Sequence, residues 1–215
     1  MFVFSRLLVE HLLNSNLRLP VHHFSDVIFK LLLGNALSLI QKHIPPQPTW
    51  FLIISDIVAS YSKDPSCLNF MAAIRKHGSK ALMWFRLSSN LQTSESCKVM
   101  HLVSVLYNVE ISYGAKIGAF CCIDHANCII IGQQARIGQN VMLMHGVTLG
   151  STGEGMVSKS VRHPIVGGGV YMGAQSSVLG GTIIGHCVTI AASSVVLRNV
   201  LPWNVAVGMP ARLLC

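Results

Sequence analysis

The stretch of sequence that decides the fold begins at Val109 and reads VEISYGAKIGAFCCIDHANCIIIGQQARIGQNVMLMHGVTL as far as Leu149. An aliphatic residue recurs in it every six positions, and the same period returns after Pro164. This spacing fits neither the 3.6-residue turn of an amphipathic helix nor the two-residue alternation of a half-buried strand. A six-residue period is typical of a parallel β-helix, which is built from short strands and turns.

The repeat contains thirteen aliphatic positions in three registered runs, separated by a two-residue insertion and by a long insertion. We expect each of these side chains to point into its coil and to stack on the equivalent side chain of the next coil. A single coil cannot bury its apolar face alone, so the stacked coils would share one continuous core. The thirteen positions are Ile111, Ile117, Ile123, Ile131, Ile137, Leu143, Leu149, Val166, Met172, Val178, Ile184, Ile190 and Val196.

The long insertion runs from Gly150 to Pro164 and reads GSTGEGMVSKSVRHP. A loop that leaves a rigid scaffold is a frequent place for binding residues, although a tolerated surface insertion has a similar composition. Because this loop ends in Arg162 and His163, we interpret it as part of a functional site.

The residues before the repeat show apolar side chains at helical spacing, in segments separated by prolines. We therefore predict an α+β chain in which an N-terminal α-helical region is followed by the parallel β-helix. This division gives a helical region at 1–108, a β-helix domain at 109–200 with a protruding loop at 150–164, and a C-terminal segment at 201–215. The helices are expected at Phe2–Leu13, His23–His43, Trp50–Ser62 and Leu68–Leu91.

The composition narrows the class of protein. Of all residues 51% are hydrophobic and 11% are charged, which excludes a disordered chain and suggests that some surface is buried between subunits. No stretch of 18 or more apolar residues is free of polar breaks, so no membrane span is expected. A net charge of +8 without a basic run interleaved with aromatics favours a phosphate-bearing ligand over nucleic acid.

The seven cysteines contain no pair at C-x-x-C spacing, so we interpret them as small buried hydrophobes rather than metal or redox ligands. Free thiols indicate a reducing compartment, and the cytosol is the expected location. The start of the chain lacks the charged leader and cleavage site of a secretory signal. An organelle is the alternative, because Glu10 is the only acidic residue among the first 25.

Several motifs resemble those of serine acetyltransferases, and the similarity is closest to the plant type. The combination of an Asp-His pair, the GVTLG segment and the RHP segment in the loop is the specific part of this resemblance. The matching segments are KDPSC at Lys63–Cys67, GAKIG at Gly114–Gly118, IDHA at Ile123–Ala126, IIIG at Ile129–Gly132, GVTLGSTG at Gly146–Gly153, RHP at Arg162–Pro164, SSVVL at Ser193–Leu197 and GMPARLL at Gly208–Leu214.

The resemblance implies a left-handed β-helix that transfers acetyl from acetyl-CoA to the hydroxyl of L-serine. The products would be O-acetylserine and CoA, in the first step of cysteine biosynthesis, with acetyl-CoA as a co-substrate, no permanently bound cofactor and no metal. His125 matches the catalytic histidine of the family, and histidine suits this role because its pKa lies near the operating pH. Glu110 takes the place of its carboxylate partner, and His163 would be a second catalytic group.

The resemblance also implies a substrate site. Asp64 and Asp124 would pair with the ammonium group of serine, and Arg162 would bind the serine carboxylate through two hydrogen bonds. Acetyl-CoA would lie along the outside of the β-helix, where the expected contacts are Gly150, Gly153, Gly173 and Ala174. His145 has two interpretations: it lines the cleft, or it lies at a subunit contact.

Five positions and one short helical segment depart from the family pattern, and the segment is Lys76-His77-Gly78, where the family has Lys-Gly-Phe. Glu110 stands where the family has Asp, Ser112 where it has His, Gln133 where it has Glu, Ser151 where it has Gly, and Val161 where it has Asp. All of these departures lie near the expected site, so a catalytically weak or inactive member is one alternative.

Assembly is a further expectation from the resemblance. β-helices of this family form homotrimers with the active sites between subunits, and the helical regions join trimers into hexamers. The family binds O-acetylserine sulfhydrylase through a longer C-terminal tail. This sequence stops at Cys215 directly after PARLL, so we expect that association to be absent or weak.

Three other functions remain open at this point. The first is a hexapeptide acetyltransferase that acts on another hydroxyl acceptor, such as a sugar or a xenobiotic. The second is a metal enzyme of the γ-carbonic-anhydrase kind, which would recruit His125, His145 and His163 as zinc ligands. The third is a β-helix that serves as a scaffold without catalysis.

Overall fold

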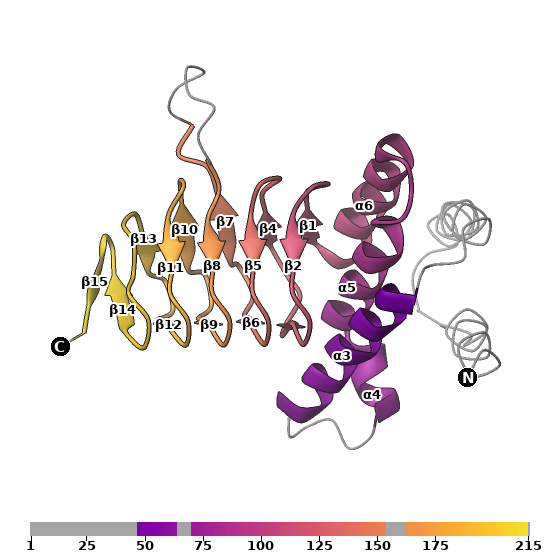
Figure 1. The fold of residues 1–215 in the computed structure, drawn as a ribbon, viewed down its shortest axis with the longest axis horizontal. Coiled ribbons are helices and arrows are strands. Elements are labelled where there is room, and N and C mark those ends of the chain that lie inside the picture. Colours follow the sequence, from indigo (N-terminus) through magenta and orange to yellow (C-terminus); the bar gives the residue numbers. More distant parts are fainter. Residues whose placement is uncertain (1–46, 64–69, 154–161, 215) are drawn as a thin grey trace, which may run out of the picture. The chain divides into compact units, whose positions relative to one another are not determined.

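The computed structural model describes residues 47–63, 70–153 and 162–214, and all of them lie within one compact unit. In this part of the chain a layer of helices precedes a parallel β-helix (Figure 1), which confirms the predicted fold class. The expected helices Phe2–Leu13 and His23–His43 and the candidate Asp64 lie outside the described residues.

Four helices are described: α3 (Gln47–Lys63), α4 (Phe70–Arg75), α5 (His77–Ser88) and α6 (Thr93–Tyr107). The first of them confirms the helix expected at Trp50–Ser62. The single helix expected at Leu68–Leu91 is wrong, because the chain breaks at Lys76, whose ψ of 139° is not helical.

The physical reason for this break lies in the next two residues. A Cβ at Gly78 would collide with the carbonyl group of Ile123, so the backbone of α5 lies directly against the first coil of the β-helix. The turn at Lys76 redirects the chain into this close approach. Helical periodicity does not reveal such a contact, because its partner is 45 residues away in the sequence.

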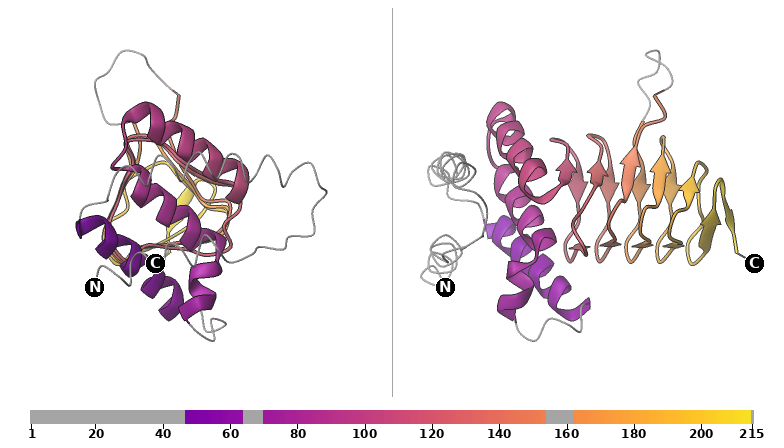
Figure 2. Two further views of the ribbon diagram at one scale, coloured as in Figure 1. Left: turned by 90° about the vertical axis from the view of Figure 1, so that its right-hand side faces the viewer. Right: turned by 180° about the vertical axis from the view of Figure 1, so that it is seen from behind.

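The β-helix has three sides, seen end-on in Figure 2, and each side is a sheet of short strands. We name the sheet β1-β4-β7-β10-β13 side A, the sheet β2-β5-β8-β11 side B, and the sheet β3-β6-β9-β12-β14-β15 side C. All neighbouring strands are parallel except β14 and β15. The strands are β1 (Val109–Ile111), β2 (Lys116–Ile117), β3 (Cys122–Ile123), β4 (Ile129–Ile131), β5 (Arg136–Ile137), β6 (Met142–Leu143), β7 (Thr148–Gly150), β8 (Ile165–Val166), β9 (Tyr171–Met172), β10 (Ser177–Leu179), β11 (Ile183–Ile184), β12 (Thr189–Ile190), β13 (Val195–Val196), β14 (Val205–Gly208) and β15 (Ala211–Leu213).

The core consists of three internal stacks of aliphatic side chains. All thirteen predicted positions are at most 7% exposed, which confirms the six-residue repeat. On side A, for example, Ile111 pairs in register with Ile131, and Ile131 pairs with Leu149. One more coil follows, in which Ala206 of β14 pairs with Ile190. The repeat did not predict it, because the six-residue spacing from Val196 falls on Pro202 rather than on an aliphatic residue.

The helices cover the first coil. Residues of α3 and α5 contact β3, and α6 leads into β1 through Asn108, whose left-handed conformation (φ 52°) ends the helix. No helix in the described ranges is long and apolar enough to cross a membrane. The helical layer therefore closes one end of the apolar core, and it places α5 beside the turn that follows β3.

Candidate active site

The turn between β3 and β4 carries the Asp-His pair predicted from the sequence. We call the column of turns between sides C and A the CA corner. An open hollow with a volume of about 700 Å³ lies against this corner. The turn contributes Asp124 and His125, the next coil contributes His145, and the helical layer contributes Lys76 and His77.

Asp124 and His125 are in contact with each other. The Oδ2 atom of Asp124 lies 3.8 Å from Nε2 of His125, and the backbone N–H of His125 donates to Oδ1 of Asp124 at 3.2 Å. The imidazole is 71% exposed, while the carboxylate is 16% exposed. An imidazole can accept and return a proton, and that of His125 is exposed at the surface of the hollow with a carboxylate beside it.

The left-handed backbone of His125 (φ 51°) is not by itself a sign of function. Phe120, Asn140 and Gln175 adopt the same conformation at other turns of the β-helix. The conformation is a property of these turns. It does not distinguish His125 from the other turn residues, although His125 lines the hollow.

His145 lies one coil further along the same corner. Its ring is perpendicular to that of His125, with a centroid distance of 6.3 Å. Of the two interpretations left open by the sequence, this position favours the one in which His145 lines the cleft. Both imidazoles therefore border the same space.

Lys76 lines the hollow, and no role was predicted for it from the sequence. Its Nζ lies 3.4 Å from Oδ1 of Asp124 and forms a part-buried ion pair. The two residues are 48 positions apart, and the lysine lies at the unpredicted break between α4 and α5. A local sequence pattern carries no signal of such a pair.

Glu110 lies on β1 with its side chain exposed, in register with Ile130. Among the described residues, the side chain of Glu110 forms no hydrogen bond or ion pair with His125 or with any other side chain. The carboxylate that contacts the imidazole is that of Asp124.

Arg162 and His163 lie at a different corner, where the chain returns from the insertion into β8. We call the column of turns between sides A and B the AB corner. The backbone N–H of Arg162 donates to Oε1 of Gln134 at 2.9 Å, and Nδ1 of His163 lies 3.4 Å from the same oxygen. The imidazole of His163 lies over Gly132, where a Cβ would collide with the ring.

Burial lowers the pKa of His163, and the neighbouring charge of Arg162 lowers it further. The imidazole is therefore neutral near pH 7, since even the ordinary pKa of histidine lies below that value. A neutral imidazole can accept a proton or a hydrogen bond from a ligand.

The candidate acetyl-CoA contacts are divided between the same two corners. Gly173 and Ala174 lie on the CA corner, next to Gln175, whose backbone N–H donates to the carbonyl of His145. Gly150 ends β7 and Gly153 (φ +72°) follows it, so both belong to the AB corner.

One chain thus brings together two separate sets of candidates. Asp124, His125, His145, Gly173 and Ala174 follow the CA corner, whereas Gly150, Gly153, Arg162 and His163 surround the AB corner. A zinc site of His125, His145 and His163 does not form within one chain, and no cluster of three potential metal ligands occurs among the residues described.

Comparison with known proteins gives one consistent family. No protein-family model matches the chain. The mitochondrial serine acetyltransferase 3 of Arabidopsis thaliana is 35% identical over 205 residues, which is 93% of this chain and 49% of the relative. The serine acetyltransferase of Buchnera aphidicola subsp. Schizaphis graminum is 32% identical over 192 residues, which is 87% of this chain and 69% of the relative. The chain spans about half the length of the plant relatives.

Solved structures agree with this result. The serine acetyltransferase of Neisseria gonorrhoeae in complex with serine superposes with a TM-score of 0.73 at 31% identity, covering 86% of this chain and 73% of the other. The soybean serine acetyltransferase complexed with serine gives a TM-score of 0.74 at 31% identity, covering 85% and 74%. A serine acetyltransferase in complex with CoA gives a TM-score of 0.72 at 29% identity, and the match covers 86% of this chain and 75% of the other.

Proposed function

The chain belongs to the serine acetyltransferase family, and from this premise we propose that it transfers acetyl from acetyl-CoA to the hydroxyl of L-serine. The products are O-acetylserine and CoA, and the reaction is the first step of cysteine biosynthesis. The observation that carries the proposal is the Asp124–His125 pair at the edge of an open hollow, in a family whose solved structures include complexes with serine and with CoA.

His125 acts as the general base. Its imidazole takes the proton from the serine hydroxyl as the oxygen attacks the thioester carbonyl. When the tetrahedral intermediate collapses, the carbon–sulfur bond breaks and the imidazolium returns the proton to the CoA sulfur. Asp124, with its carboxylate 3.8 Å from Nε2, stabilises the imidazolium between these two steps.

Glu110 is the second carboxylate proposed to support His125. Glutamate is one methylene longer than the aspartate of the family pattern, and its side chain is exposed on β1, so it has room to turn toward the CA corner. Its role would be to orient the imidazole rather than to contact the substrate.

The serine molecule is held by its two charged ends. Asp64 and Asp124 attract the ammonium group, and Arg162 binds the carboxylate through its planar guanidinium. His163, neutral at pH 7, accepts a hydrogen bond from the substrate. Gly150, Gly153, Gly173 and Ala174 let the backbone approach the pantetheine arm of acetyl-CoA.

A homotrimer would complete the site, because the CA corner of one copy would face the AB corner of the next. Two observations support this arrangement: the division of the candidates between two corners, and the exposed apolar side chains of Ile130 on side A and Ile183 on side B. Pairing of trimers through the helical layer would give a hexamer. We propose the cytosol as the compartment, with an organelle as the alternative, since the Arabidopsis relative is named mitochondrial.

The first test is CoA release from acetyl-CoA in the presence of L-serine. Wild-type protein should release CoA only when serine is present, and His125→Ala should lower kcat by about 10²- to 10⁴-fold. His101→Ala is the matched control, because His101 is an exposed histidine of α6 away from the hollow. Bound acetyl-CoA without serine-dependent release would favour another hydroxyl acceptor or an inactive member.

A second test addresses the shared site. His125→Ala and His163→Ala proteins are each expected to be nearly inactive. If each site takes its two histidines from two copies, random mixed trimers should regain up to about a quarter of the wild-type activity. No recovery after verified subunit exchange would contradict the shared site and leave the family assignment intact.

A further inference from the structure

The amino-binding end of the proposed site already holds a cation of the protein itself. Lys76 Nζ lies 3.4 Å from Oδ1 of Asp124, and the two side chains are 22% and 16% exposed. Such a part-buried pair is screened less by water than a surface pair. The carboxylate proposed to attract the ammonium group of serine is therefore partly neutralised before the substrate binds.

Both oxygens of Asp124 have neighbours. Oδ1 accepts from Lys76 Nζ and from the backbone N–H of His125, at 3.4 and 3.2 Å. Oδ2 lies 3.8 Å from Nε2 of His125. A substrate ammonium must displace Lys76, or share the carboxylate with it at the cost of repulsion between two like charges.

Asp124 is the one carboxylate among the residues described that line the hollow, which also contains His77 and His145. Lys76 reaches this place because the chain breaks between α4 and α5 and because Gly78 lets α5 lie against Ile123. The position of the lysine is thus built into the junction of the helices with the first coil.

We propose that Lys76 determines the acceptor specificity of this site by competing with the acceptor's ammonium group for Asp124. The inference rests on the proposed function and deepens it. It makes this chain a weak discriminator between serine and short hydroxy acids that carry the same carboxylate and hydroxyl but no amino group.

The test compares L-serine with 3-hydroxypropionate, which is serine without its amino group. The dissociation constants of both ligands are measured by calorimetry on full-length wild-type protein and on Lys76→Met, which keeps the length of the side chain and removes its charge. Lys98→Met is the matched control, because Lys98 is an exposed lysine of α6 outside the hollow.

We expect Lys76→Met to bind serine about five- to tenfold more tightly than wild type, with 3-hydroxypropionate changed by less than about twofold. The tighter binding should shrink at high salt, because added ions screen the interaction. In the CoA-release assay, KM for serine should fall in Lys76→Met, and Lys98→Met should match wild type throughout.

The proposal is overturned by serine binding that is unchanged or weaker in a Lys76→Met protein with a wild-type melting temperature, or by the absence of serine binding to either protein. A lower melting temperature with weaker binding of both ligands would assign Lys76 a structural role, which also overturns it. Because the main readout is binding, the proposal about Lys76 can be tested even if serine binds but is not acetylated. That outcome would contradict the proposed function alone.

Discussion

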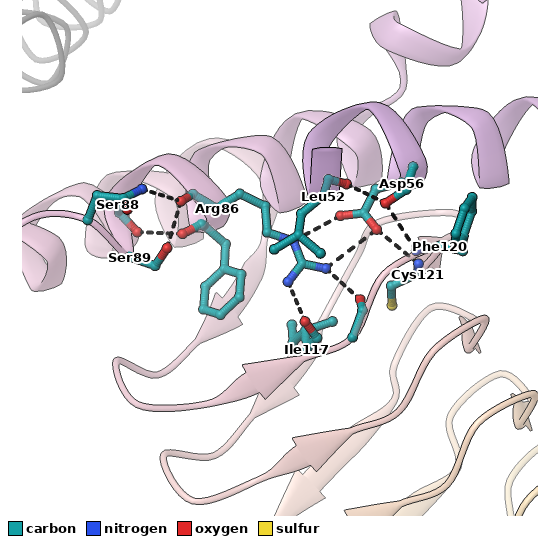
Figure 3. A network of polar contacts seen from close by, with 12 residues as sticks. Leu52, Asp56, Arg86, Ser88, Ser89, Ile117, Phe120 and Cys121 are labelled. Carbon is teal, nitrogen blue, oxygen red and sulfur yellow. Dashed lines mark hydrogen bonds and ion pairs between the residues drawn. The ribbon is translucent and has the colours of Figure 1, made fainter. Parts of the chain in front are cut away.

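Arg86 of α5 and Asp56 of α3 form a buried ion pair at the junction between the helices and the β-helix (Figure 3). The Nε–Oδ2 distance is 3.0 Å, and the side chains are 4% and 2% exposed. The guanidinium also donates to the carbonyl of Ile117 and to that of Gly118, the latter at 2.7 Å. Asp56 accepts the backbone N–H of Cys121 at 2.9 Å. The pair therefore satisfies backbone groups at the turn that the helices cover.

Removal of the guanidinium should be costly. Arg86→Met leaves the buried carboxylate of Asp56 without its charged partner and the carbonyls of Ile117 and Gly118 without the guanidinium donors, so we expect the free energy of unfolding to fall by about 3–5 kcal/mol. Urea unfolding followed by circular dichroism measures this loss. Arg75→Met, which removes an exposed arginine of α4, should change stability by less than about 0.5 kcal/mol.

Asp56 should make stability depend on pH. Burial raises the pKa of Asp56 from 3.8 to about 6, against the opposing effect of Arg86. A raised carboxyl pKa favours folding below pH 4, and this contribution is lost as the pH rises through 6. Between pH 4 and pH 7, the free energy of unfolding of wild type should fall by on the order of 2–3 kcal/mol relative to that of Asp56→Asn. If the free energy of unfolding of wild type minus that of Asp56→Asn stays constant or increases with pH, the raised pKa is contradicted.

Gly132→Ala should act through His163 rather than through folding. An added methyl group would collide with the imidazole of His163, which is the far end of a flexible side chain, so the ring has to move. The methyl group would also lie 3.0 Å from the carbonyl oxygen of Leu149, a tight contact that asks for only a small shift of the coil. We expect activity to fall about as far as in His163→Ala, with little change in melting temperature. In the double-mutant cycle, Gly132→Ala should have almost no effect once His163 is absent.

Gly78→Ala should destabilise the helix–coil junction. Alanine normally stabilises a helix by about 1 kcal/mol relative to glycine, but here the methyl group would meet the carbonyl of Ile123. We expect a net loss of about 1–3 kcal/mol in thermal or urea unfolding. Ser79→Ala is the control, because the buried Ser79 hydroxyl has no hydrogen-bond partner among the described residues and its loss should be neutral or slightly stabilising.

His163 should titrate below the ordinary histidine value of 6.5. Because burial is the larger cause and Arg162 the smaller one, Arg162→Gln should raise this pKa only in part. Titration of the histidine ring protons by NMR measures both values. A pKa above 6.5 in wild type, or no response to Arg162→Gln, would contradict the placement of these two side chains.

Much of the fold could be predicted from the sequence because its signal is periodic and local. The thirteen aliphatic positions repeat wherever a coil repeats, and all are buried. The six-residue pattern did not predict the last coil, around Ala206, because the repeat is interrupted there. The helical pattern did not predict that the chain forms two helices separated at Lys76. The candidate pair Asp124 and His125 was also identifiable, because it matches the Asp-His motif of the family that the sequence resembles.

The tertiary structure alone decided which of these residues meet. It placed Arg162 and His163 on a different corner from His125, and it joined Lys76 to Asp124 across 48 residues and Arg86 to Asp56 across 30. The reason is physical: a repeat is set by side chains that bury the same face in every coil, whereas an ion pair depends on where two distant backbone segments pack. The sequence by itself therefore determined the β-helix and its candidate chemistry, and the packing of the helices on the first coil decided the surroundings of Asp124.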